Sequence, residues 1–173
     1  MLFKRILFYF IIGSICLFIQ LSIFTNNFLA IKNVMPDIIL VLIILLFQIC
    51  DDFEMLIFAF VTGFVIDVYS GNLAGLNAFF YCIVVALLYN FKNYLNIKTL
   101  PFYLFLVLLS LLIKLFIYYL FGYIFKEVFV IYKSTLLSYA IHILYTLFWV
   151  PFLSMIIYIK PIIELNSKKM YGK

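Results

Sequence analysis

The residues of this chain that could do chemistry are few, and most of them lie in one stretch of sequence. Gly63, Asp67 and Gly71 follow one another at intervals of four, so they lie on roughly one face of a helix while that helix lasts. An acidic side chain in an apolar segment is a candidate functional residue, because a charge away from water is costly to keep. Asp67 is therefore either a ligand-binding acid or an acid that caps the following turn, and we favour the cap.

The small residues around Asp67 predict a close helix contact and a tight turn. Gly63 has no side chain, which lets another backbone approach closely. Gly71 and Gly75 can adopt positive φ, so they suit a turn after the helix. Ser70 can satisfy backbone groups that become free at the helix end. A tight turn with a fixed acid is useful for holding a partner helix as well as for binding a ligand.

Polar groups interrupt the apolar sequence at two further places. Pro36 suits the first position of a helix and Asp37 is favoured in its first turn, so we expect Asp37 to act as a helix cap. Lys114 lies about halfway along an apolar segment, where a lone ammonium is costly unless it is paired. We expect one internal pair that holds helices together rather than an ion relay, with Asp67 and His142 as candidate partners.

The sequence contains none of the motifs that mark common active sites or cofactor sites. It has no Ser-His-Asp set, phosphate loop, HExxH motif or paired catalytic carboxylates. Cys16, Cys50 and Cys82 lack CxxC spacing and clustered histidines, which disfavours a zinc site or a disulfide framework. We therefore expect no enzyme activity, no cofactor and no metal site.

The composition places these residues in a membrane protein. Of the 173 residues, 69% are hydrophobic and only 11% are charged, and the mean hydropathy is +1.27. An ordinary soluble domain is about 45–50% apolar and about 25% charged. This excludes a cytosolic enzyme, a secreted domain and a disordered chain. The net charge of +5 comes from basic residues that sit mostly at the edges of apolar runs, a pattern typical of contact with anionic lipids rather than nucleic acid.

Hydropathy and helix-breaking residues predict an all-α integral membrane protein with six transmembrane helices in a single polytopic domain. We keep the second and third apolar runs as two crossings rather than one re-entrant hairpin, because the hairpin tip would bury Asp51, Asp52 and Glu54. Pro151 predicts a kink in the last span. The expected spans are residues 6–24, 36–49, 55–69, 76–91, 100–125 and 135–159.

The distribution of basic residues predicts the orientation of these spans. Most of the 12 lysine and arginine residues fall in the inner segments if the N-terminus is inside, so we expect both termini to be cytoplasmic. The first apolar run imitates a signal peptide. It is, however, about as long as a full span and no A-x-A cleavage site follows it, so we expect an uncleaved first helix.

The order of these residues resembles the core of the rod shape-determining protein MreD family. Pro36-Asp37 opens an apolar helix, a charged turn follows, and the glycine-rich segment around Asp67 comes next. The length, the six expected spans and the proline in the last span fit as well. The residues that carry the resemblance are Pro36, Asp37, Gly63, Asp67, Ser70, Gly71 and Gly75, with Pro151 in the last span.

The resemblance implies a non-enzymatic scaffold in the bacterial cytoplasmic (inner) membrane, within the elongation complex that maintains rod cell shape. The partners it implies are an MreC-like protein, the actin-like protein MreB, the peptidoglycan synthases of the lateral wall and membrane lipids. In this interpretation Gly63 is the point of close approach for a partner helix, and the turn from Asp67 to Gly75 forms a shaped outer rim. The acidic residues around position 52 and Lys114 depart from the pattern of the family.

The alternative is a substrate-binding membrane subunit of an energy-coupling-factor vitamin importer. These proteins have six spans, a similar length and a cavity open to the outside, and the MreD family is similar to them in fold. They dock their partner through small residues spaced i, i+4 on the first helix. The first apolar run here has Gly13 and Ser14 but no Ala-x-x-x-Ala pair, which disfavours the importer.

Overall fold

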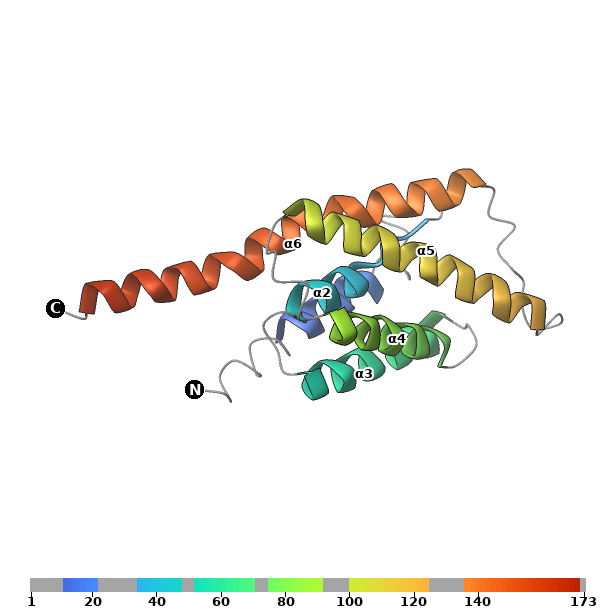
Figure 1. Ribbon diagram of the computed structural model, residues 1–173, viewed down its shortest axis with the longest axis horizontal. Helices are drawn as coiled ribbons and strands as arrows, with labels where there is room; N and C mark the ends of the chain where they lie inside the picture. The colour runs from blue at the N-terminus through green and yellow to red at the C-terminus, as the bar shows by residue number, and fades with distance from the viewer. Residues whose placement is uncertain are drawn as a thin grey trace.

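The computed structural model shows an all-helical chain (Figure 1), as the sequence predicts. It describes residues 11–21, 34–47, 52–70, 75–91, 100–124 and 136–171, and no β-strand occurs among them. The helices are a first helix at Ile11–Leu21, α2 (Ile38–Leu46), α3 (Asp52–Ser70), α4 (Leu76–Phe91), α5 (Leu100–Ile124) and α6 (Leu136–Tyr171).

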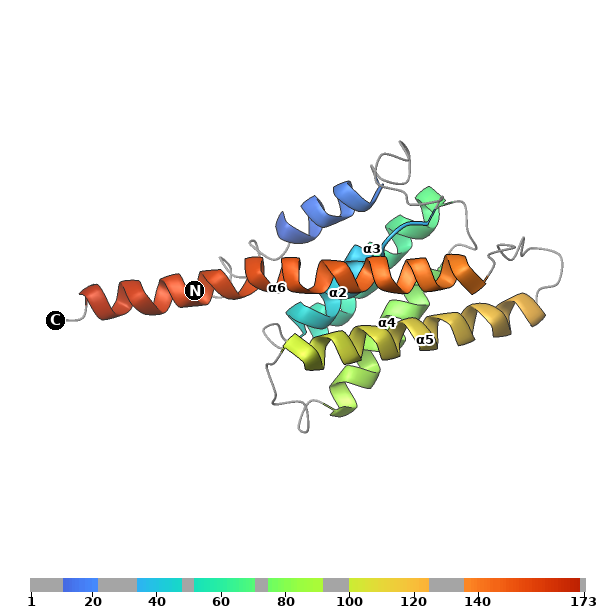
Figure 2. The same cartoon turned by 90° about the horizontal axis from the view of Figure 1, so that it is seen from above.

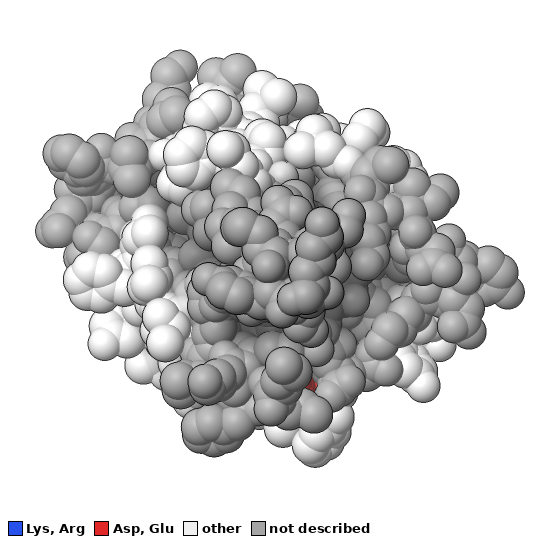
Figure 3. Space-filling view, turned by 90° about the vertical axis from the view of Figure 1, so that its left-hand side faces the viewer, with Lys and Arg blue, Asp and Glu red and all other residues white. Residues whose placement is uncertain are grey.

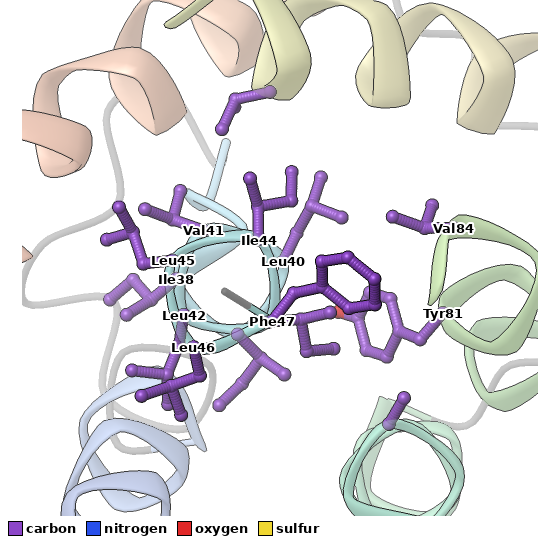
Figure 4. Close-up of a cluster of buried hydrophobic side chains, with 14 of the residues drawn as sticks. Ile38, Leu40, Val41, Leu42, Ile44, Leu45, Leu46, Phe47, Tyr81 and Val84 are labelled. Carbon is purple, nitrogen blue, oxygen red and sulfur yellow. The ribbon is translucent and has the colours of Figure 1, made fainter. Parts of the chain in front are cut away.

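Helix α2 forms the buried centre of the molecule. All nine of its residues are buried, and it contacts α3, α4, α5 and α6. Seen end-on, its apolar side chains point outward in every direction (Figure 4). A helix that is hydrophobic all round is enclosed by protein or by lipid, and the contacts of α2 with four other helices show that protein encloses it.

The short length of α2 differs from the expected crossing at residues 36–49. At 1.5 Å per residue a nine-residue helix is about 14 Å long, roughly half of the hydrocarbon thickness of a bilayer. Hydropathy alone misses this difference, because a helix enclosed by protein and a helix enclosed by lipid are equally apolar. The count of six crossings therefore stays a prediction.

Three helices in the described part of the chain are long and apolar enough to cross a membrane: Phe53–Ser70, Leu100–Phe121 and Ser138–Met155. Ile11–Leu21 and Leu76–Asn90 are shorter apolar helices. Large apolar side chains lie exposed along these helices, and the face in Figure 3 shows almost no charge on its described atoms. An apolar surface of this extent indicates a membrane location, because it would aggregate in water.

The helices form two pairs on opposite sides of α2. Helices α3 and α4 pack side by side and make the most extensive contact in the structure, while α5 and α6 pair on the other side (Figures 1 and 2). The first helix contributes Cys16 to the same apolar core as α2. This arrangement brings the beginnings of α2, α4 and α6 to the end of the bundle where α3 finishes, and the polar residues meet there.

Helix α6 is longer than the expected span at residues 135–159. It continues through Pro151 and past Lys160-Pro161 to Tyr171, and its last turns project beyond the bundle (Figure 2). A proline removes one backbone hydrogen bond, and membrane helices tolerate this when other groups satisfy the freed backbone. The expected span end at residue 159 stays a prediction, because a polar and proline-containing segment can leave the apolar region and remain helical.

Candidate functional site

Asp37 caps α2 as the sequence predicts, but the helix begins after it, at Ile38, so Pro36 precedes the helix rather than occupying its first position. Asp37 is the N-cap residue, and its Oδ1 accepts a hydrogen bond from the backbone N–H of Leu40 at 3.2 Å. Pro36 immediately precedes it and is buried. An aspartate in this position satisfies one of the N–H groups that every helix leaves unpaired at its start.

The Asp37 carboxylate also joins helices that are far apart in sequence. The Tyr81 hydroxyl of α4 donates to Oδ1 at 2.6 Å, and the Lys114 ammonium of α5 forms an ion pair with Oδ2. The backbone N–H of Asp37 donates to Oγ1 of Thr146 on α6 at 3.1 Å. Asp37 therefore holds α2, α4, α5 and α6 together at one point.

The ion pair corrects the expected partners of Lys114. Lys114 forms one internal pair, but its partner is Asp37 and neither Asp67 nor His142. Its ammonium also lies near the faces of three aromatic rings, at 5.2 Å from the Phe80 centroid and at 5.6 and 5.8 Å from two tyrosine centroids. A cation is attracted to such ring faces, which adds to the stability of the pair.

His142 and Gln20 complete the surroundings of the α2 N-terminus. The His142 Nδ1 lies 2.6 Å from the backbone carbonyl oxygen of Met35. Because a carbonyl only accepts hydrogen bonds, we assign the proton to Nδ1. Gln20 of the first helix accepts a hydrogen bond from the Ile39 N–H through Oε1 at 3.0 Å. These contacts fix the segment before α2 between the first helix and α6.

Asp67 organises the connection between α3 and α4. Its side chain is 1% exposed, and its oxygens accept hydrogen bonds from the backbone N–H groups of Gly75 at 3.1 Å, Asn77 at 3.0 Å and Ala78 at 3.2 Å. The Asn77 side-chain amide donates to it at 2.7 Å. Asp67 is therefore the cap of the turn, the role favoured from the sequence, and its oxygens are occupied by this chain.

Gly63 makes its close contact inside the chain. It is buried, and a Cβ atom built on it would lie 2.5 Å from Cα and 2.6 Å from N of Ala78. The expected close approach exists, but the neighbouring backbone is α4 and not a partner helix. The structure gives no support to Gly63 as a docking point for another protein, because α4 already fills that space.

The other residues singled out from the sequence are spread over the structure. Gly75 has a φ of +97°, in the region that glycine adopts readily, and the Ser70 hydroxyl donates to the Asp67 carbonyl at 3.3 Å. Pro151 lies exposed on α6, away from the polar residues. Gly71 lies outside the described residues, as does Cys50, while Cys16 and Cys82 are free thiols.

Hydrogen bonds extend from Asp67 to Tyr118, whose ring lies 5.8 Å from the Lys114 ammonium that pairs with Asp37. The Tyr118 hydroxyl on α5 donates to Asn77 Oδ1 at 3.0 Å, and the amide of Asn77 reaches Asp67. Tyr118 lies one helical turn after Lys114, which pairs with Asp37. The two acids thus belong to one polar cluster between α3, α4 and α5.

A cavity of about 230 Å³ lies beside this cluster. The first helix, α3, α4, α5 and α6 all contribute side chains to its wall. The N-cap residue of α2, Asp37, also lines it. No group of three His, Cys, Asp or Glu side chains able to hold a metal ion occurs in the described part of the chain. The polar side chains lining the cavity are Gln20, Asp37, Ser70, Asn77, Tyr81, Lys114, Tyr118, Ser138, Tyr139 and His142.

Sequence reasoning missed several residues of this cluster. Tyr81 could not be distinguished from the many other tyrosines, because its role depends on its distance to Asp37. Gln20, Asn77 and Thr146 carried a weak signal, since each is a polar residue within or at the edge of an apolar run. In a membrane such residues usually contact another helix.

The fold and the polar cluster define a helical integral membrane protein whose buried charges hold its own helices together. The chain matches the family model of the rod shape-determining protein MreD over residues 4–160. It therefore belongs to the rod shape-determining protein MreD family, as its resemblance indicates, and has a role in determining rod shape. No curated protein and no solved structure was found to match the chain.

Proposed function

We propose that this protein is a non-enzymatic scaffold of the bacterial elongation complex, which links MreC and MreB to peptidoglycan synthesis in the lateral wall. The observation that carries this proposal is the family match over residues 4–160. In this proposal the chain crosses the cytoplasmic membrane six times and both termini are cytoplasmic. The importer subunit is disfavoured, because the match is to a shape-determining family.

The internal use of the polar residues supports a structural role. Asp37, Lys114 and Asp67 are held by hydrogen bonds and an ion pair within the chain, so they stabilise a fixed arrangement of helices. A scaffold needs such rigidity, because partners must dock on surfaces with a constant shape. We propose that the Asp67–Gly75 turn forms the outer rim of this scaffold, with Asp67 shaping the turn rather than contacting a partner.

Partner docking then has to use the exposed apolar faces. Phe60 and Phe64 stack on the outer side of α3 with ring centroids 6.3 Å apart, and both side chains are about half exposed. Phe116 on α5 and Phe148 on α6 are more than 60% exposed. Interface cores are enriched in aromatic residues, so each of these faces is a candidate surface for an MreC-like helix.

Depletion in a rod-shaped host that carries this gene tests the role in the complex. Depleted cells labelled with a fluorescent cell-wall precursor should become round and lose label along the lateral wall. Expression of the wild-type chain from a second copy should restore both. Cells that stay rod-shaped but acquire a nutrient requirement would contradict the scaffold and favour the importer.

Site-specific photo-crosslinking tests the docking surface. Benzoylphenylalanine placed at Phe64, Phe116 or Phe148 samples the exposed faces of α3, α5 and α6 in turn, where the exposed side chain leaves room for the added benzoyl group. At least one of these positions should form a crosslink to the MreC-like partner. The same three variants kept without ultraviolet irradiation are the control and should form no crosslink to it. The absence of crosslinks at all three exposed positions would contradict docking on these faces.

A further inference from the structure

We propose that the cavity at the N-terminal end of α2 binds a small molecule or a lipid headgroup through an anionic oxygen group, a carboxylate or a phosphate. A scaffold needs no such ligand, so this inference goes beyond the proposed function. It rests on the side chains that line the cavity and on which of their atoms are already in use.

Of the two charged groups in the ion pair, the Lys114 ammonium is the more exposed to the cavity. The Asp37 side chain is 2% exposed and the Lys114 side chain is 16% exposed. The Asp37 oxygens already accept hydrogen bonds from Tyr81, from the Leu40 N–H and from Lys114. An ammonium has three N–H donors, and among the described residues Asp37 receives the one hydrogen bond that Lys114 donates. Two donors therefore remain for a ligand.

The other polar side chains that line the cavity also favour a ligand that accepts hydrogen bonds. Asp37 is the only acidic side chain lining the cavity within the described residues, and its oxygens are occupied as above. Tyr139 and His142 lie one turn apart on α6 and both line the cavity. The Tyr139 hydroxyl is a further potential donor, and the positive end of the α2 dipole lies at the same place. Charge-assisted hydrogen bonds to an oxyanion are the strongest interaction that these groups can offer.

The size of the cavity limits what enters it. Its volume is about 230 Å³, somewhat below the range of about 300–1,000 Å³ that is typical of small-molecule sites. That space holds a phosphate or carboxylate with a short attached group, and it is too small for a whole lipid or a large metabolite. Leu111 and Ile66 line part of the wall and would contact the apolar part of the ligand.

Thermal unfolding of the purified full-length chain in a nonionic detergent tests the proposal. Trp149 is the only tryptophan, so its fluorescence follows unfolding without other tryptophan signals. In one arm, sodium phosphate or sodium acetate replaces sodium chloride at constant ionic strength. In the other, phosphatidylglycerol or phosphatidylcholine is added to the micelles. A ligand that binds the folded state raises the melting temperature in a saturable way.

The two arms distinguish the source of the ligand. A saturable rise with phosphate or acetate identifies a free anion. A rise with phosphatidylglycerol, but not with phosphatidylcholine or the free anions, identifies a lipid headgroup. No saturable rise with any of these additions overturns the proposal.

A pair of variants on α6 links the response to the cavity. Ser138→Leu fills part of the cavity and leaves Asp37 and Lys114 in place, whereas Ala140→Leu adds the same bulk at an exposed position two residues away. Ser138→Leu should weaken the apparent affinity at least tenfold, and Ala140→Leu should leave it unchanged. Equal responses in both variants overturn the proposal, because binding then occurs elsewhere.

A second variant tests the proposal independently of Ser138→Leu, in case that substitution disturbs the fold. Asp37→Asn combined with Lys114→Gln removes both charges together, so it leaves no buried charge without a partner. This double variant should lose the saturable response, since the cation that faces the ligand is gone. A response of wild-type strength overturns the proposal.

Discussion

Exchange of Lys114 for methionine should destabilise this protein more than any surface substitution. Methionine keeps most of the length of the side chain and its apolar contacts, but it removes the ammonium that pairs with Asp37. The carboxylate is then left 2% exposed and without a countercharge. A buried charge that loses its partner is costly, because neither water nor an opposite charge stabilises it.

The magnitude follows from the contacts that remain. Removal of one partner from a buried ion pair typically costs about 3–5 kcal/mol. Tyr81 and the Leu40 N–H still donate to the carboxylate, which places Asp37 toward the lower end of that range. The loss of the ammonium over three aromatic rings adds roughly 0.5–1 kcal/mol. We therefore expect Lys114→Met to lower the free energy of unfolding by about 4 kcal/mol.

A double-mutant cycle isolates the ion pair from other effects. Asp37→Asn with Lys114→Met removes both charges while asparagine keeps an oxygen acceptor for Leu40 and Tyr81. The double variant should recover about half of the stability lost by Lys114→Met. Because Asp37→Asn alone also leaves a buried charge without its partner, the coupling energy should exceed about 2 kcal/mol. Glu54→Gln is the control, because Glu54 is a partly exposed acid on α3 and its change should stay within about 0.5 kcal/mol.

Unfolding by sodium dodecyl sulfate in mixed micelles gives these free energies, with Trp149 fluorescence and far-ultraviolet circular dichroism as two probes. Wild type, both single variants, the double variant and Glu54→Gln are compared under the same conditions. The reasoning is refuted if Lys114→Met is as stable as Glu54→Gln. It is also refuted if the losses of the two single variants simply add in the double variant.

Three glycine and acid substitutions test the connection between α3 and α4 by the same unfolding assay. Gly63→Ala should lower the free energy of unfolding by about 1–3 kcal/mol, because its new Cβ would meet the Ala78 backbone. Gly13→Ala is the control and should lower it less, since its new Cβ would meet only the movable end of a side chain. Equal losses in the two variants would contradict this reasoning. Asp67→Ala should lower the free energy of unfolding by roughly 2–3 kcal/mol, since several buried N–H donors lose their acceptor. A loss below about 0.5 kcal/mol would contradict the capping role. Gly75→Ala should lower the free energy of unfolding by about 1–2 kcal/mol from its positive φ alone, because the added Cβ atom would meet no other atom. Unchanged stability would argue against that backbone conformation.

Local patterns were predictable from the chain because they depend on neighbours in sequence. Pro36 before Asp37 predicts a helix start, and α2 begins directly after this pair, at Ile38, with Asp37 as its N-cap. The spacing of Asp67 before Gly75 predicts a capped turn, and the carboxylate does accept from the N–H groups at the beginning of α4. Each of these contacts joins residues no more than about ten positions apart, so few arrangements of the chain can satisfy them.

The sequence reasoning failed where the outcome depends on which helix faces meet. Asp37 and Lys114 are 77 positions apart, and the sequence did not distinguish Asp37 from the other polar side chains, Asp67 and His142, as the partner of the lysine. Gly63 predicted a close approach, but a glycine carries no information about whether its neighbour belongs to the same chain. The folded structure assigns that neighbour to α4.

Composition and hydropathy are properties of the chain itself, and they were sufficient to establish a helical membrane protein and, with its motifs, its family. The burial of α2, the partner of Lys114 and the cavity beside it arise from packing between helices. In a soluble protein the polar face of each helix would reveal its orientation. In a membrane protein, lipid and the protein interior both favour apolar side chains, so hydropathy does not show which face of a helix packs against other helices. Only the position of each helix in space settles where its few polar groups meet.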